Sequence, residues 1–208
     1  MSGCFITFEG VEGVGKSTQL GLLEDRLVSD GFDVVVTREP GGTPLAEQMR
    51  ALVLHNRSEP MPDAAELMLM FAARAVHTEN LIRPALERGA IVLCDRYTDA
   101  TYAYQGGGRG IADRLIDPLV ELAQRGLWPA LTILLDAPVG PSLERAKART
   151  GKTDRIESET LAFFERVRDR YRARAAAEPG RIQVVDATGS REAVAARIQT
   201  LIRPILGR

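Results

Sequence analysis

The stretch Gly10-Val11-Glu12-Gly13-Val14-Gly15-Lys16-Ser17 decides the fold of this chain. An apolar run at residues 4–8 precedes it and is typical of a buried strand, while residues 18–28 follow with the leucine spacing of a helix. A glycine-rich turn between a strand and a helix is the context of a phosphate-binding loop, whose backbone N–H groups surround a polyphosphate at the helix N-terminus. In such a loop Lys16 contacts the β- and γ-phosphates, and the Ser17 hydroxyl binds Mg²⁺. The sequence therefore predicts binding of a nucleoside triphosphate.

The composition is that of one ordinary globular domain covering residues 1–208, with 45% hydrophobic and 26% charged residues. A net charge of −1 argues against a nucleic-acid-binding module and against attraction to a membrane surface. No apolar stretch approaches the ~20 residues of a membrane-spanning helix, and no signal peptide precedes the first strand. Cys4 and Cys94 fall in apolar strands, so we expect buried, reduced thiols and a cytoplasmic protein.

Strands alternate with helices along the whole chain, which predicts an α/β fold with a parallel sheet. Four further apolar runs are expected to be strands covered on both faces, at residues 33–37, 90–94, 131–135 and 182–185. Helical spacing is found at residues 16–30, 43–55, 63–88, 99–106, 111–125, 139–150, 157–177 and 190–206. Asp63 and Glu66 resemble a capping pair at the start of the third of these helices.

Charged residues follow several of the predicted strands. Glu39 lies beyond the second strand, and Asp95 and Arg96 end the third. Because ligands of open parallel sheets bind beyond the carboxyl ends of the strands, we expect these side chains to converge near the phosphate-binding loop.

Two helical segments carry groups suited to binding a nucleoside. Phe71 and Arg74 share one helix face, and an arginine on an apolar face needs a polar partner. Thr101, Tyr104 and Gln105 offer hydroxyls, a ring and an amide that can bind a nucleobase and a sugar.

A basic segment at residues 145–155 contains five cations within eleven residues. Such a cluster is usually a solvated helix face, but an arginine from a mobile segment can also stabilise a transferring phosphoryl group. Arg145 and Arg149 are four positions apart and share a face, whereas Gly151 would let Lys152 and Arg155 move separately. We expect Arg145 to lie near the adenine of ATP and Arg149 near the transferring phosphoryl group.

Taken together, the motifs resemble those of bacterial thymidylate kinases over essentially the whole chain. The resemblance rests on the phosphate-binding loop together with Thr37-Arg-Glu-Pro-Gly-Gly-Thr43, Phe71-Ala-Ala-Arg74, Asp95-Arg-Tyr97, Tyr104-Gln-Gly-Gly-Gly-Arg-Gly110 and Asp154-Arg-Ile-Glu157. It implies a P-loop nucleoside monophosphate kinase fold, with a five-stranded parallel sheet, helices on both faces and a lid at about residues 145–157. Gly13 stands where one subtype carries a loop arginine, so the resemblance implies the subtype whose lid supplies the arginine. Lys147 departs from the family, which often has arginine there.

The resemblance also implies a reaction: transfer of the γ-phosphoryl group from ATP to dTMP with Mg²⁺, in a cytoplasmic homodimer. The residues implied in catalysis are Lys16, Asp95, Arg96 and Arg149. Those implied in ATP binding are Gly10, Val11, Glu12, Gly13, Val14, Gly15, Lys16, Ser17, Thr18 and Arg145, with Ser17 and Asp95 at the metal. Those implied in dTMP binding are Glu12, Glu39, Arg50, Phe71, Arg74, Arg96, Thr101, Tyr104 and Gln105.

Two alternatives make different predictions. A kinase for another nucleoside monophosphate, or for a nucleoside, would not need Arg74 and Gln105 as partners of the base edge. A GTP-dependent switch protein would carry an Asn-Lys-x-Asp element, which is absent from this sequence.

Overall fold

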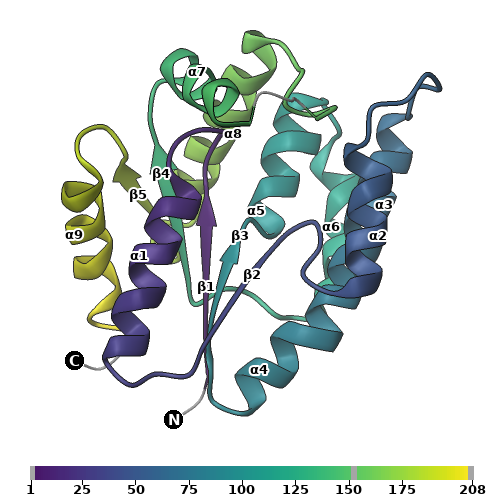
Figure 1. Cartoon of the computed structure of the whole chain (residues 1–208). Coiled ribbons are helices and arrows are strands. Elements are labelled where there is room, and N and C mark those ends of the chain that lie inside the picture. Colours follow the sequence, from purple (N-terminus) through teal and green to yellow (C-terminus); the bar gives the residue numbers. More distant parts are fainter. Residues whose placement is uncertain (1–2, 151–153, 206–208) are drawn as a thin grey trace.

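The computed structural model describes residues 3–150 and 154–205, except for the side chains of residues 149 and 150. Its centre is one parallel sheet in the order β2-β3-β1-β4-β5 (Figure 1). The strands are β1 (Cys4–Glu9), β2 (Val34–Arg38), β3 (Ile91–Asp95), β4 (Leu131–Asp136) and β5 (Ile182–Asp186). The three central strands are almost entirely buried, as their continuous apolar runs predict. The predicted α/β class and five-stranded parallel sheet are confirmed.

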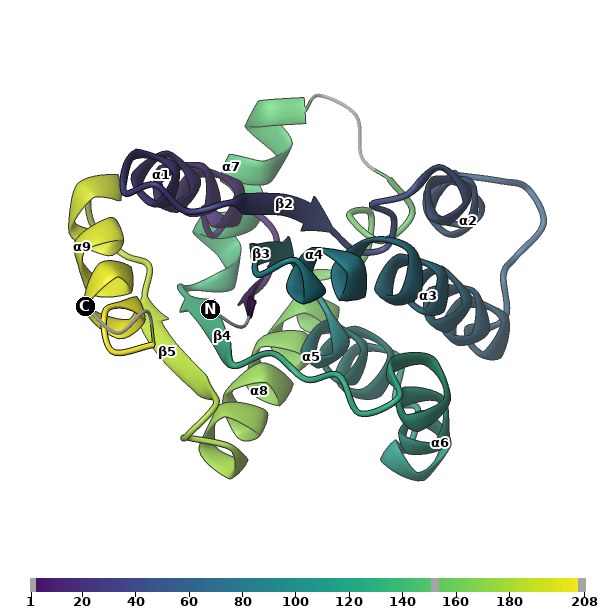
Figure 2. The same cartoon turned by 90° about the horizontal axis from the view of Figure 1, so that it is seen from below.

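Helices cover both faces of the sheet. The helical elements are α1 (Lys16–Ser29), α2 (Pro44–Leu54), α3 (Asp63–His77), η1 (Thr78–Ile82), α4 (Arg83–Glu87), α5 (Thr98–Thr101), η2 (Tyr102–Gly108), α6 (Asp113–Gln124), α7 (Val139–Thr150), α8 (Leu161–Ala177) and α9 (Arg191–Ile202). Helices α1 and α9 pack on one face, and α4, α5 and α8 on the other (Figures 1 and 2). Helices α2, α3 and α6 form a group to the side of the sheet (Figure 2). No helix within the described ranges is both long and apolar enough to cross a membrane.

One predicted helix cap and one predicted helix start differ from the structure, while α3 begins at Asp63 as predicted. The capping pair at the start of α3 is wrong: Pro62 occupies the cap position without a side-chain hydrogen bond, and Glu66 instead bonds residues outside the helix. Helix α8 begins at Leu161 rather than near 157, because Asp154 Oδ1 accepts from two backbone N–H groups in a turn and Thr160 caps the helix. In both places the side chains make hydrogen bonds that the spacing of apolar residues does not reveal: Glu66 bonds Gln105, and Asp154 stabilises a turn before the helix.

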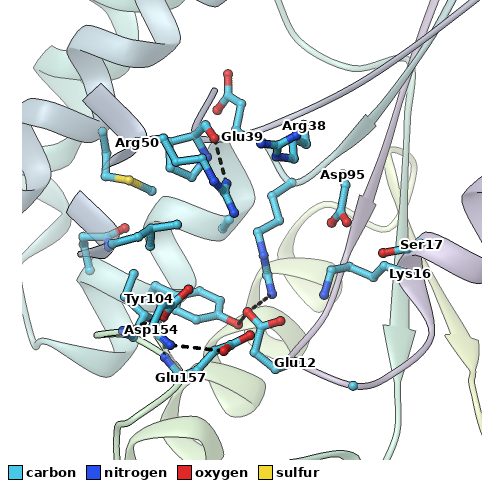
Figure 3. A pocket seen from close by; sticks show the side chains of 18 of the residues that line it. Glu12, Lys16, Ser17, Arg38, Glu39, Arg50, Asp95, Tyr104, Asp154 and Glu157 are labelled. Carbon is cyan, nitrogen blue, oxygen red and sulfur yellow. Dashed lines mark hydrogen bonds and ion pairs between the residues drawn. The ribbon is translucent and has the colours of Figure 1, made fainter. Parts of the chain in front are cut away.

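The carboxyl ends of β1, β2 and β3 meet at one edge of the sheet. Lys16, Arg38 and Asp95 face a common cavity there (Figure 3). The predicted convergence of charged strand ends at the phosphate-binding loop is therefore found in the structure.

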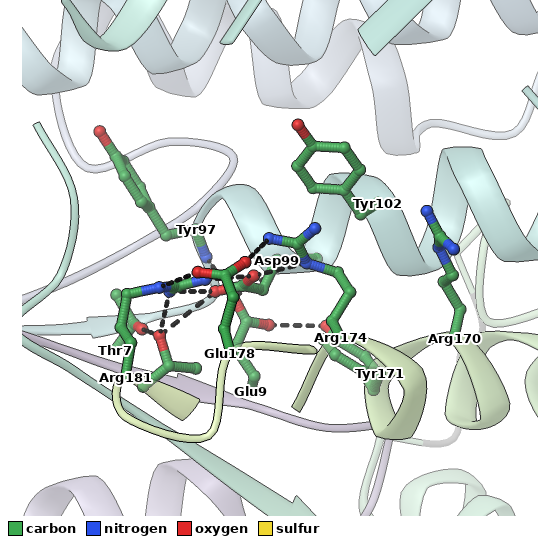
Figure 4. A network of polar contacts seen from close by, with 12 residues as sticks. Thr7, Glu9, Tyr97, Asp99, Tyr102, Arg170, Tyr171, Arg174, Glu178 and Arg181 are labelled. Atoms are coloured by element: carbon green, nitrogen blue, oxygen red, sulfur yellow. Dashed lines mark hydrogen bonds and ion pairs between the residues drawn. The ribbon is translucent and has the colours of Figure 1, made fainter. Parts of the chain in front are cut away.

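A buried ion-pair cluster joins α5 to α8 and to the residue before β5 (Figure 4). Asp99 of α5 is 2% exposed and binds Arg174 of α8 at 2.7 Å and Arg181, before β5, at 2.7 and 3.0 Å. Burial alone would raise the pKa of Asp99, but the two arginines lower it below its ordinary value. The cluster thereby fixes α5 against α8 and the last strand.

Glu9, the last residue of β1, joins β1 to the turn that follows β3 (Figure 4). Its Oε1 accepts from the backbone N–H groups of Tyr97 at 2.7 Å and Ala100 at 3.3 Å, and its Oε2 accepts from the Tyr171 hydroxyl at 2.6 Å. Burial and the nearby charge of Asp99 raise the pKa of Glu9 to about 7. This carboxyl group therefore begins to ionise only near neutral pH.

The raised pKa of Glu9 predicts a pH dependence of stability. Because the pKa is 4.5 in the unfolded chain and about 7 in the folded one, the folded state holds the proton more tightly. The stability gained is fully present below pH 4.5 and is lost as the pH rises through 7. Between pH 5 and 8 the free energy of unfolding of the wild type should fall by about 2–3 kcal/mol more than that of Glu9→Gln. Denaturant titrations at both pH values measure the difference; the exposed Asp25→Asn should follow the wild type, and equal pH dependence in Glu9→Gln would contradict the prediction.

Candidate active site

The phosphate-binding loop spans the end of β1 and the start of α1. Gly13 has φ +72°, and a Cβ built on it would lie 1.8 Å from the carbonyl oxygen of Ser142 in α7. Only glycine fits this close approach of α7 to the loop. The predicted strand–loop–helix context is therefore present, with α7 packed directly over the loop.

Lys16 lies folded over the loop. Its Nζ donates to the carbonyl oxygens of Gly10 at 3.1 Å and Val11 at 3.0 Å, and the residue is 6% exposed. Burial and then the charge of Arg96 lower the pKa of Lys16, while Glu12 opposes this change. Among the described residues, the ammonium group thus donates to backbone carbonyls at the mouth of the loop.

Arg96 lies beside Lys16 at the phosphate-binding loop and lines the same cavity. Its guanidinium donates to the Gly10 carbonyl at 2.9 Å, to Glu12 Oε1 at 2.6 Å and to the Tyr171 hydroxyl at 3.1 Å. It also lies 4.7 Å from the centre of the Tyr104 ring. Burial disfavours its charge, but Glu12 and its other neighbours raise the pKa of Arg96 well above the ordinary value. The charge of Arg96 is therefore retained inside the protein.

The cavity has a volume of about 250 Å³ and two distinct sides. On one side are Glu12, Gly13, Gly15, Lys16, Ser17, Asp95 and Arg96. On the other side are Arg38, Glu39, Pro40, Arg50, Leu54, Met70, Ala100, Tyr104, Gln105, Asp154, Ile156 and Glu157. A phosphate-binding loop and a wall with an aromatic ring and an amide thus enclose one space.

Asp95 and Ser17 present oxygen atoms at the loop side of this cavity. Asp95 Oδ1 is buried and has no hydrogen-bond donor among the described residues. No group of three or more histidine, cysteine or acidic side chains suited to a metal is found in the described ranges. An ion held by Ser17 and Asp95 would complete its ligand shell with phosphate oxygens and water, as Mg²⁺ commonly does.

Arg74 lies directly behind the other wall, 1% exposed. Its Nε donates to Glu39 Oε2 at 2.7 Å, and its Nη2 donates to Thr101 Oγ1 at 2.9 Å and the Tyr97 carbonyl at 3.1 Å. The guanidinium also lies 4.9 Å from the centre of the Phe71 ring. Arg74 thus has the polar partner that the sequence required, and Nη1 is buried without a partner among the described residues.

Of the predicted dTMP-site residues, Glu12, Glu39, Arg50, Arg96, Tyr104 and Gln105 line the cavity. Phe71, Arg74 and Thr101 are packed behind its wall and are almost fully buried. Arg50 donates to the Pro40 carbonyl at 2.8 Å, and its pKa is lowered by burial and by Arg38.

Two buried residues behind this wall were not predicted from the sequence as part of the site. His77 Nδ1 lies 3.0 Å from Glu39 Oε1, and its Nε2 lies 2.7 Å from Thr37 Oγ1, so the ring holds Glu39 from behind. Glu66 Oε1 accepts from Gln105 Nε2 at 2.7 Å. The only signal for His77 was its helical spacing of three from Arg74.

The basic segment divides into separate parts. Arg145 donates from Nε to the Gly13 carbonyl at 3.0 Å, beside a groove of about 540 Å³ that Thr18 and Gly189 also line. Arg149 belongs to α7, but its side chain, like all of Lys152, lies outside the described residues.

Arg155, for which Gly151 was expected to allow separate movement, contacts the body of the protein in the structure. Its Nε donates to the Val53 carbonyl at 2.9 Å, its N–H donates to the Leu54 carbonyl at 3.1 Å, and its Nη2 pairs with Glu66. The guanidinium is therefore held between α2 and α3.

Comparisons with known proteins identify the family of this chain. The family model described as thymidylate kinase matches residues 8–198. A thymidylate kinase of Pseudomonas putida is 55% identical over 208 residues, which cover 100% of this chain and 99% of the relative. One of Ectopseudomonas mendocina is 52% identical over 206 residues, covering 99% and 98%.

A solved structure agrees as well. The crystal structure of thymidylate kinase from Ehrlichia chaffeensis superposes with a TM-score of 0.79 at 33% identity, covering 97% of this chain and 99% of the other. This chain thus combines a phosphate-binding loop and the Asp95-Arg96 turn with the cavity wall in front of Arg74. Its relatives match it over almost the whole length. The chain belongs to the thymidylate kinase family.

Proposed function

We propose that Lys16, Arg96 and a magnesium ion stabilise the phosphoryl group while this chain transfers it from ATP to dTMP, giving dTDP and ADP in dTTP synthesis. Phosphoryl transfer needs little covalent help from a protein and depends on in-line positioning and charge stabilisation. One observation carries the proposal: the phosphate-binding loop, Arg96 and Gln105 line the same cavity, and the buried Arg74 lies behind the Gln105 side of it. Two substrates bound on those two sides meet at Lys16 and Arg96.

The ATP side is assigned to the loop residues, and Ser17 and Asp95 are the residues that would hold Mg²⁺ there. The unpaired, buried Oδ1 of Asp95 supports this assignment, since a buried carboxylate oxygen without a donor is costly unless a cation or a donor reaches it. When bound, the metal neutralises charge on the phosphate oxygens. Arg145, next to Gly13 and the neighbouring groove, is assigned to the adenine end of ATP.

The dTMP side is assigned to the opposite wall. Arg74, Thr101 and Gln105 bind the base edge, Phe71 stacks on the ring, Tyr104 and Glu12 contact the sugar, and Arg96 binds the monophosphate. Glu39 and Arg50 complete the monophosphate end of the pocket. The free Nη1 of Arg74 and the free Oε1 of Gln105 among the described residues support the base assignment, because each lacks the partner that a base would supply.

We further propose that residues 145–157 act as a lid on a single domain, and that the protein works as a cytoplasmic homodimer. The lid proposal is supported by α7, which packs on the loop and carries Arg145 and Arg149.

The acceptor preference tests the proposed function. We compare the kcat/KM of each acceptor, measured as ADP release from Mg-ATP, when dTMP, dUMP, dCMP, AMP, GMP and thymidine are offered separately. The highest kcat/KM should be that of dTMP. Thymidine should be inactive because it lacks the acceptor phosphate. A better rate with a purine monophosphate or with thymidine would assign the cavity to a different kinase.

The lid assignment gives two arginines of α7, Arg145 and Arg149, different kinetic roles. Because charge that acts only in the transition state affects turnover rather than ground-state binding, Arg149→Ala should lower kcat by about 10²–10⁴-fold with little change in the KM for dTMP. Arg145→Ala should mainly raise the KM for ATP. Steady-state kinetics of both variants, with the exposed Arg114→Ala outside the lid as control, measure this. A mild effect of Arg149→Ala beside a severe one of Lys152→Ala would assign the role to Lys152.

A further inference from the structure

Glu66 of α3 is a buried carboxylate shared by three side chains from distant parts of the chain. It is 1% exposed. Its Oε1 accepts from Gln105 Nε2 at 2.7 Å, and its Oε2 pairs with Arg109 at 3.3 Å and with Arg155. None of these contacts belongs to α3 itself, so Glu66 is held by tertiary interactions alone.

The carboxylate remains ionised in this environment. Burial would raise the pKa of Glu66, but the hydrogen bonds from Gln105 and Arg155 and the charge of Arg109 lower it below the ordinary value. An ionised carboxylate has no proton to donate and can only accept hydrogen bonds. Gln105 must therefore direct its NH₂ group, and not its carbonyl oxygen, toward Glu66.

This contact leaves the Gln105 carbonyl as the group available to a ligand. Gln105 lines the cavity, and its Oε1 is buried without a partner in the described part of the chain. Arg74 Nη1 is likewise buried and unpartnered there. Thr101 links the two residues, because its hydroxyl accepts from Arg74 and it precedes Gln105 by four positions along α5 and η2. Gln105 Oε1 in the wall and Arg74 Nη1 behind it are therefore one unpartnered acceptor and one unpartnered donor in the described part of the chain.

A donor together with an acceptor matches one kind of pyrimidine. Thymine and uracil present a carbonyl oxygen at position 4 beside an N–H at position 3, so they offer an acceptor and a donor in return. Cytosine presents an amino group at position 4 beside an unprotonated ring nitrogen, which is the opposite order. Reversing the Gln105 amide would replace the acceptor with a second donor and remove the partner of the thymine N–H.

We infer that Glu66 is a positioning residue that fixes the direction of the Gln105 amide and thereby selects thymine and uracil against cytosine. The inference rests on the proposed role of Gln105 in binding the base. Glu66 does not contact substrate; it acts by accepting the amide hydrogens that would otherwise be free to turn toward the base.

Glu66→Gln tests this role with almost no change of shape. The new side chain can both accept and donate, so it permits either direction of the Gln105 amide. The pair to compare is dUMP and dCMP, which both lack the methyl group and differ only at the edge in question. In the wild type dUMP should bind at least tenfold more tightly than dCMP, since a site built to pair a polar edge rejects the mismatched one strongly. In Glu66→Gln that ratio should fall by roughly tenfold, measured as dissociation constants by calorimetry and as kcat/KM.

Asp63→Asn is the matched control. Asp63 lies one turn before Glu66 on α3, is half exposed and pairs with Arg109 at 3.7 Å, yet it has no hydrogen bond to Gln105 among those described. Removing its charge should leave the dUMP-to-dCMP ratio unchanged. Glu66→Asp is the second variant: it keeps a negative charge for Arg109 and Arg155 but withdraws it from Gln105, and it should lower the ratio in the same direction.

Three results would overturn the inference. Equal affinity of the wild type for dUMP and dCMP would do so without any variant. Equal weakening of both acceptors in Glu66→Gln, with the ratio intact, would mean that Glu66 acts only by holding Arg155 and Arg109. Gln105→Leu distinguishes failure of the base-binding role of Gln105 from failure of the positioning role of Glu66. If Gln105→Leu leaves the dTMP affinity unchanged, both roles fail. If it weakens dTMP binding while Glu66→Gln keeps the dUMP-to-dCMP ratio, only the role of Glu66 fails.

Discussion

The geometry of the site depends on the side chain of Glu9, which joins the end of β1 to the turn after the neighbouring parallel strand β3. Glu9 ends β1, immediately before the phosphate-binding loop, and accepts the N–H groups of Tyr97 and Ala100 after β3. Between these points Arg96 adopts φ +71°, a left-handed conformation that non-glycine residues rarely take. The surrounding hydrogen bonds hold the Arg96 guanidinium against Glu12 and the Gly10 carbonyl. Without this connection, the Arg96 guanidinium would not be held against the phosphate-binding loop at the edge of the cavity.

Several buried polar atoms near the cavity have no hydrogen-bond partner in the described part of the chain. They include Asp95 Oδ1, Arg74 Nη1 and Gln105 Oε1. An unpaired buried polar group costs about 1–3 kcal/mol. A bound molecule can supply the missing partner of such an atom. Each substrate should therefore raise the free energy of unfolding, because it binds the folded state and not the unfolded one. Their position on the two sides of one cavity agrees with a metal-bound nucleotide on one side and a pyrimidine on the other.

Local patterns predicted the elements of the fold and the groups at the strand ends. The apolar runs and the glycine-rich turn placed the sheet and the loop, because both follow from short-range periodicity. The requirement of Arg74 for a polar partner was also sound, and Glu39 is that partner. The supporting residues were not predicted because they act over long separations: Glu9 meets Tyr97 across 88 positions, His77 meets Glu39 across 38, and Gln105 meets Glu66 across 39. Glu66 was misread as a capping residue, since its helical position satisfied that pattern while its carboxylate was used elsewhere.

A variant of Arg74, a buried arginine on the proposed dTMP side, should change the affinity for one substrate and not for the other. Calorimetric titration of Arg74→Ala with dTMP and, separately, with Mg-ATP tests this division, with the exposed Arg114→Ala as control and thermal unfolding to verify that the variant is folded. The dTMP affinity should fall by about 1–3 kcal/mol, the cost of leaving a buried polar edge unpaired, while the Mg-ATP affinity stays within twofold of the wild type, roughly the change expected of a residue outside that pocket. Loss of Mg-ATP binding with dTMP binding intact would contradict the assignment of the two sides.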